Sequence, residues 1–168
     1  MRAWWFLPVV SGLAGLLTFC GAFFDRGASV VVRDADGRVV SRPPLPDSDS
    51  FEIEYAHSYY DAPTVETFSA NPRGGFELVG VSSPSEAVLD YYGLEGRKTT
   101  AGGWMHLVPS EPRRFEELSL IGTEKGRKTL VVSGERQPLF EKSGAPVHLT
   151  LRVEKDSFVT EARETLGG

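Results

Sequence analysis

The chain has almost no cysteine. Among its 168 residues only Cys20 is a cysteine, and it lies in the apolar N-terminal segment, so the remainder can form neither a disulfide nor a thiolate metal site. An excess of positive charge is also missing, because 18 basic residues against 23 acidic ones give a net charge of −5. Since clustered lysine and arginine bind phosphate backbones, nucleic acid is not an expected partner.

Motifs of the common enzyme classes are missing as well. The sequence contains no glycine-rich phosphate loop, no Gly-x-Ser-x-Gly elbow, no His-Glu-x-x-His sequence and no acidic calcium loop. We therefore expect no cofactor and no metal centre, and we assign no catalytic residue. A binding protein is favoured over an enzyme.

The N-terminal segment is a long uncharged stretch. No charged residue occurs from Ala3 to Phe24, which is about the length of a helix that spans a bilayer. Arg2 would stay in the cytoplasm by the positive-inside tendency, which directs the remainder outward. The sequence predicts a signal peptide or a transmembrane anchor over residues 1–24 and leaves both open. Lipidation of Cys20 is a weaker alternative, because the bulky Phe19 precedes it.

Beyond this segment the sequence predicts one exported domain with one core. A linker is expected over residues 25–28, a β domain over 29–154 and a charged C-terminal tail over 155–168. The expected localisation is extracytoplasmic, either anchored in the cytoplasmic membrane or secreted across it.

Glycine and proline set the fold class. Eighteen glycines and eleven prolines separate short β-prone runs, a composition typical of turn-rich β folds. One short helix is expected within residues 84–96, and residues 97–103 are expected to form a loop. The sequence predicts an all-β domain, an antiparallel β-sandwich or partly open barrel after one N-terminal apolar helix, with strands over 28–33, 38–42, 51–57, 64–68, 76–82, 104–108, 115–121, 129–133 and 147–153.

The hairpin expected over residues 51–68 contains the densest group of polar side chains. Its first strand alternates apolar and polar residues, which places His57 on the apolar face. We expect His57 to pair with Thr64 and Tyr55 with Glu66, with Ser58 to Pro63 as the loop. Glu66 then lies diagonal to His57, about 7 Å away at the Cα atoms, and a hydrogen bond between their side chains follows.

His57, Ser58, Asp61 and Glu66 are the candidate site residues, all within ten positions of one another. A histidine beside carboxylates can act as a general base, bind a divalent metal with help from His106, or hold the polar group of a ligand. The same group can also be a structural pair that fixes the hairpin. His148 lies on the polar side of the last strand and is expected at the surface.

The sequence Tyr55-Ala56-His57-Ser58, followed by Pro63 and Glu66, resembles the signature of a small bacterial family of unknown function. The family pattern is aromatic-x-His-Ser-Val-Glu with a downstream Pro-x-x-Glu, and a later Gly-Trp step is matched by Gly103-Trp104. In this chain Tyr59-Tyr60 replaces the Val-Glu pair, and the sequence over residues 92–96 departs from the family's Gly-Ala-Gly turn.

The resemblance implies a short exported protein commonly encoded beside tripartite ATP-independent periplasmic (TRAP) transporters of the TAXI type. From it we expect a non-enzymatic extracytoplasmic accessory protein, whose partner is a transporter or a solute-binding protein. The alternative is a small enzyme or a metal- or ligand-binding domain centred on His57 and Glu66.

Overall fold

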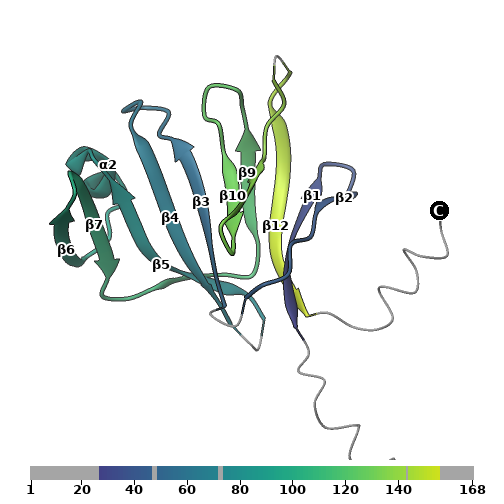
Figure 1. Cartoon of the computed structure of the whole chain (residues 1–168), viewed down its shortest axis with the longest axis horizontal. Helices are drawn as coiled ribbons and strands as arrows, with labels where there is room; N and C mark the ends of the chain where they lie inside the picture. Colours follow the sequence, from purple (N-terminus) through teal and green to yellow (C-terminus); the bar gives the residue numbers. More distant parts are fainter. Residues whose placement is uncertain (1–26, 47–48, 72–73, 143, 156–168) are drawn as a thin grey trace, which may run out of the picture.

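The computed structural model describes residues 27–46, 49–71, 74–142 and 144–155. The expected signal peptide or anchor over 1–24 and nearly all of the expected tail lie outside these residues. The described part is all-β with one short helix, as the composition predicts (Figure 1). Its elements are β1 (Ala28–Asp34), β2 (Val39–Ser41), β3 (Ser50–Ala56), β4 (Pro63–Ala70), β5 (Phe76–Ser83), α2 (Glu86–Tyr91), β6 (Gly96–Ala101), β7 (Trp104–Pro109), β8 (Arg113–Phe115), β9 (Leu118–Gly122), β10 (Thr129–Val132), β11 (Glu135–Pro138) and β12 (Val147–Lys155).

The strands form two antiparallel sheets. The small sheet has the order β2-β1-β12-β9, and the large sheet has the order β11-β10-β3-β4-β5-β7-β6, with β8 paired to β5 beyond the end of β7. β8 belongs to the large sheet and β9, only two residues later, to the small one, so this stretch joins the two sheets. Lys155, expected in the tail, is the last residue of β12, and Ala28, the boundary between the expected linker and the first expected strand, is the first residue of β1.

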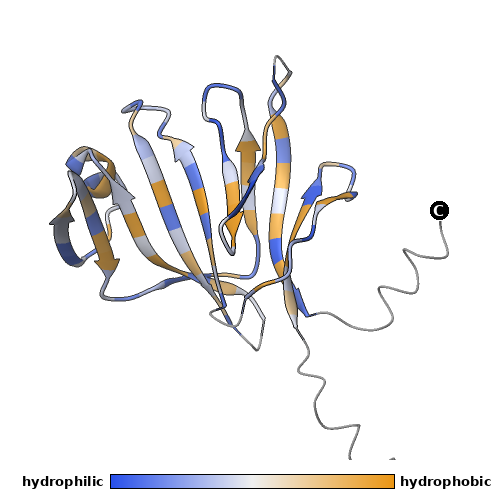
Figure 2. Cartoon of the chain, viewed as in Figure 1, coloured by the Kyte–Doolittle hydropathy of each residue, from blue (hydrophilic) through white to orange (hydrophobic). Residues whose placement is uncertain are grey.

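One core lies between the sheets. Apolar and polar residues alternate along β3, β4 and β12 (Figure 2), so each of these strands turns one face inward. Val30, Val32 and Leu151 of the small sheet belong to the same buried cluster as the large-sheet residues. Phe51 and Phe68 are cross-strand partners whose rings stack at 5.1 Å, a contact that contributes about 1 kcal/mol beyond burial.

The helix α2 covers the inner face of the large sheet near β5 and β7. Val88 and Leu89 are fully buried in the core, and Ser85 is the N-cap residue. Tyr92 follows the last helical residue, so it lies at the same end of the core. Among the described residues, no helix is long and apolar enough to cross a membrane.

Two expected connections are strands instead. Residues 97–103, expected to form a loop, contribute β6, and residues 134–146, expected as a connection, contribute β11. Both are edge strands in which every residue is exposed. They have no buried face, so the apolar alternation that marks a half-buried strand is absent from their sequence.

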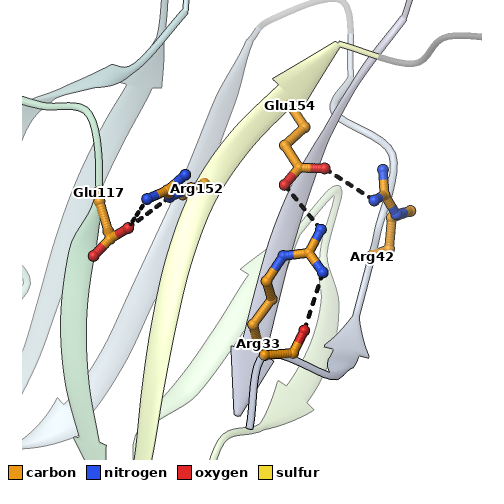
Figure 3. A network of polar contacts seen from close by, with 6 residues as sticks. Arg33, Arg42, Glu117, Arg152 and Glu154 are labelled. Carbon is orange, nitrogen blue, oxygen red and sulfur yellow. Dashed lines mark hydrogen bonds and ion pairs between the residues drawn. The ribbon is translucent and has the colours of Figure 1, made fainter. Parts of the chain in front are cut away.

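Ion pairs tie the small sheet together (Figure 3). Glu154 near the end of β12 accepts hydrogen bonds from Arg33 of β1 at 3.1 Å and from Arg42, just after β2, at 2.9 Å. Glu117 pairs with Arg152 in the same region. Burial by itself raises the pKa of Glu154, but the hydrogen bonds and charges of the two arginines outweigh it and hold the pKa below its usual value.

Candidate functional site

The register of the β3–β4 hairpin differs from the expected one by two residues. Tyr55 pairs with Thr64 and Ile53 with Glu66, so the expected pairs His57–Thr64 and Tyr55–Glu66 are wrong. The turn has the expected six residues but begins one residue earlier, since Ala56 pairs with Pro63 and the His57 amide donates to the Ala62 carbonyl at 2.8 Å, which places His57 in the turn itself. A two-residue shift leaves every side chain on its expected face, because the side-chain period of a strand is two.

Glu66 accepts its hydrogen bonds from two tyrosines. The Tyr92 hydroxyl donates to Glu66 Oε1 at 2.5 Å and the Tyr55 hydroxyl donates to the same oxygen at 3.1 Å. The two hydroxyl groups also contact each other. Glu66 therefore accepts from Tyr55 and Tyr92 in place of the expected hydrogen bond with His57. In the observed register Tyr55 is the residue diagonal to Glu66.

The electrostatics of this group oppose proton transfer by its phenols. Burial raises the pKa values of Tyr55 and Tyr92 well above the usual value, and the negative charge of Glu66 raises both further. A tyrosine that acts as a base or nucleophile needs a lowered pKa. Tyr55, Tyr92 and Glu66 thus form a closed hydrogen-bonded group at the polar end of the core.

Lys128, the residue immediately before β10, also belongs to this group. Its ammonium nitrogen lies 4.3 Å from the centre of the Tyr55 ring, within the range of a cation–π interaction. Burial lowers the pKa of Lys128, and the nearby charge of Glu66 partly offsets this. Lys128 therefore contributes positive charge beside the phenols and His57.

His57 is 6% exposed and lies beneath aromatic rings. Its ring centre is 4.8 Å from that of Tyr91 in an edge-to-face contact and 5.2 Å from that of Tyr60. Its Nδ1 accepts a long hydrogen bond, 3.4 Å, from the Tyr59 amide. Burial lowers the pKa of His57, the charge of Lys128 lowers it further, and Glu66 acts in the opposite direction. The histidine is therefore shielded from solvent, and its pKa lies below the usual value.

Three tyrosines near His57 form what we call the tyrosine tip: Tyr60 and Tyr91, whose rings contact His57, and Tyr59, whose ring contacts Tyr60. Tyr59 is 79% exposed and Tyr91 is 66% exposed. Tyr60 contacts the other two rings edge to face, at 4.9 Å from Tyr59 and 6.3 Å from Tyr91. The tip therefore presents to solvent two tyrosine rings that pack on either side of Tyr60, with a buried histidine beneath Tyr60 and Tyr91.

Ser58 and Asp61 are not part of the buried group. Both lie in the exposed β3–β4 turn, where Asp61 has a left-handed backbone with φ 49°. Of the four candidates taken from the sequence, the structure brings only His57 and Glu66 to the polar end of the core. The sequence did not reveal Tyr92 and Lys128, which come from elements remote along the chain and carry no local signal.

His106 does not assist His57. It lies on the outer face of the large sheet, where its Nδ1 is 2.8 Å from the Ser82 hydroxyl oxygen. Within the described ranges, no group of three histidine, cysteine, aspartate or glutamate side chains is placed to hold a metal ion. His148 is exposed, as its place on the polar side of β12 predicts.

No protein-family model, no curated protein and no solved structure matches the chain.

Proposed function

We propose that this protein is a non-enzymatic interaction module that acts outside the cytoplasmic membrane and serves a solute-uptake system of the TRAP type. The observation that carries the proposal is the tyrosine tip. Tyrosine gives a large contact area for little loss of side-chain entropy, and it is enriched among the residues that dominate binding at interfaces. Tyr60 already packs against both Tyr59 and Tyr91, which lowers the cost of ordering these rings on binding.

The polar group beneath the tip supports binding over catalysis. Glu66 is occupied by Tyr55 and Tyr92, both phenols have raised pKa values, and His57 is buried. Neither phenol has the lowered pKa that a base or nucleophile needs, and His57 is shielded from solvent. Its role in this proposal is to fix the turn that carries the tip.

The partner class rests on the resemblance of the Tyr55–Glu66 segment to the family encoded beside TAXI-type transporters. We propose as partner the solute-binding protein or the membrane subunits of such a transporter. The test is titration of the purified full-length protein against each, with the dissociation constant measured by surface plasmon resonance. We expect Tyr59→Ala and Tyr91→Ala each to weaken binding at least tenfold.

Ile121→Ala is the control, because Ile121 is a large apolar residue of the small sheet that is 51% exposed. It should bind like the unaltered protein. No binding to any component of the transporter, or equal binding by the tip variants, contradicts the proposal. The location is tested separately: alkaline phosphatase fused after Gly168 should be active, whereas activity only of a cytoplasmic reporter at the same position contradicts an extracytoplasmic domain.

A further inference from the structure

The outer face of the large sheet has a groove that the tyrosine tip does not use. Its volume is about 480 Å³, within the range of roughly 300 to 1,000 Å³ typical of small-molecule sites. Its lining comes from β3, β4, β10 and β11, from Trp104 at the start of β7 and from neighbouring loops. Glu54 and Val65 are cross-strand partners on this face, opposite in direction to the buried Ile53.

Apolar and aromatic side chains supply much of the lining. Trp104 at the start of β7 and Phe140 after β11 are both half-buried, and Val65 and Pro63 line the groove as well. Such walls accommodate the apolar body of a small ligand.

One pair of charges in the groove is already neutralised. Arg136 of β11 donates to both carboxylate oxygens of Glu54 on β3. In this bidentate pair the guanidinium and the carboxylate bind each other. Neither group therefore determines the charge of a ligand.

Two other charges in the groove have no partner. The side chains of Arg127 and Asp61 both line it, are exposed, and make no ion pair or hydrogen bond with the rest of the described chain. They approach the same end of the groove from two loops: the Ala56 amide donates to the Gly126 carbonyl at 2.8 Å, and Ala56 pairs with Pro63, two residues after Asp61. One positive and one negative group, neither of them paired, thus line the same groove.

We propose that this groove binds a small zwitterionic solute with an apolar body, of the kind represented by an apolar α-amino acid. Arg127 binds the carboxylate, since a guanidinium matches carboxylate geometry, and Asp61 binds the ammonium group. The apolar body lies along Trp104 and Val65. This site is separate from the tyrosine tip, and it holds whether or not the tip binds a transporter.

Fluorescence of Trp104 provides the test. The chain has three tryptophans, so Trp4→Phe and Trp5→Phe in the full-length protein leave Trp104 as the only one. Titration with L-leucine and L-phenylalanine should change its emission in a saturable way. 3-Phenylpropionate lacks the ammonium group and phenethylamine lacks the carboxylate, so each should bind at least tenfold more weakly than L-phenylalanine.

Substitutions test the roles given to the two charged side chains. Arg127→Gln and Asp61→Asn should each weaken amino-acid binding about tenfold, and Asp61→Asn should largely abolish the preference over 3-phenylpropionate. Arg97→Gln is the matched control, because Arg97 is also exposed but lies on β6, outside the groove lining. Tyr91→Ala should leave the titration unchanged, which separates this result from the test of the tip.

The comparison of ligands uses the unaltered groove, so it does not depend on the folding of any groove variant. The absence of a saturable change with both amino acids overturns the proposal. Equal binding of the two phenyl analogues and L-phenylalanine overturns it as well.

Discussion

The Tyr55 hydroxyl donates to Glu66 Oε1 across a diagonal of the β3–β4 hairpin, because Tyr55 pairs with Thr64 while Glu66 pairs with Ile53. This relationship occupies Glu66 with phenols and leaves His57 in the turn, under the tyrosine tip. A carboxylate in a partly buried position needs such donors, since an unsatisfied group there costs about 1–3 kcal/mol. The hairpin register therefore decides which side chain satisfies Glu66.

Removal of one phenol hydroxyl should destabilise the domain. Tyr92→Phe deletes the 2.5 Å hydrogen bond to Glu66 and keeps the packing of the ring. We expect the free energy of unfolding to fall by about 1–2 kcal/mol, measured by urea denaturation. Tyr91→Phe is the neighbouring control, because Tyr91 is 66% exposed, and it should change stability by less than about 0.5 kcal/mol. Equal effects of the two variants contradict the role given to the Tyr92 hydroxyl.

The sequence predicts the local features of this region and misses the long-range ones. Alternation along residues 51–55 correctly predicts the buried face with Phe51 and Ile53, and Asp36-Gly37 correctly predicts the turn between β1 and β2. The register depends on where the six-residue turn begins, and nothing in the sequence specified that the His57 amide would bond to the Ala62 carbonyl. Moving a turn of this length by one residue along the chain shifts the pairing by two and keeps the strand faces, so the face pattern cannot decide it.

The partners of Glu66 illustrate a second limit. Tyr92 is separated from it by 26 positions, and only the packing of α2 onto the large sheet brings the two together. Lys128 reaches the same place from the loop before β10. Neither residue lies in a distinguishing local pattern, because a tyrosine after a helix and a lysine in a loop are common at protein surfaces. The groove residues Arg127 and Asp61 likewise come from two loops remote along the chain that line the same groove.

His57 should titrate below its usual pKa of 6.5. The cause is first burial and then the positive charge of Lys128, so Lys128→Met should raise the His57 pKa toward the usual value. Lys125→Met in the same loop is the control and should leave it unchanged, because Lys125 is exposed. The measurement is the pH dependence of the imidazole nitrogen shifts by NMR. A His57 pKa at or above 6.5 in the unaltered protein contradicts the prediction.

The lowered pKa of His57 also predicts how the stability of the domain depends on pH. Since the folded pKa of His57 lies below the unfolded value of 6.5, the unfolded chain binds more protons as pH falls below that value. The contribution of His57 to stability is therefore complete above pH 6.5 and is lost as pH decreases toward the folded pKa. His57→Gln should remove this slope from the unfolding free energy measured between pH 5 and 7.

Glu154 should make the free energy of unfolding depend on pH in a lower pH range. Its folded pKa lies below the usual 4.5, so its stabilisation is present above pH 4.5 and disappears as pH falls through the folded pKa. Glu154→Gln should cost about 1 kcal/mol at pH 7, because the carboxylate is about one-third exposed, and the difference from the unaltered protein should vanish in acid. Glu117→Gln is the control, since its pair with Arg152 is more exposed and its loss should be smaller. An undiminished difference in acid contradicts the ionic cause.

Gly122 is the position where the fold should tolerate a side chain least. It ends β9, and a Cβ there would lie 1.8 Å from the Leu139 carbonyl oxygen, in backbone that cannot yield as a flexible side chain does. Gly122→Ala should therefore destabilise the domain by about 3 kcal/mol, as overpacking does elsewhere. Gly80→Ala is the control, because a Cβ on that strand residue meets Thr67 at an ordinary 3.5 Å. Alanine there should be neutral or stabilise by up to about 1 kcal/mol, since glycine weakens a strand interior. Urea denaturation of both variants measures the difference, and a stable Gly122→Ala protein contradicts the close approach of β9 to the segment after β11.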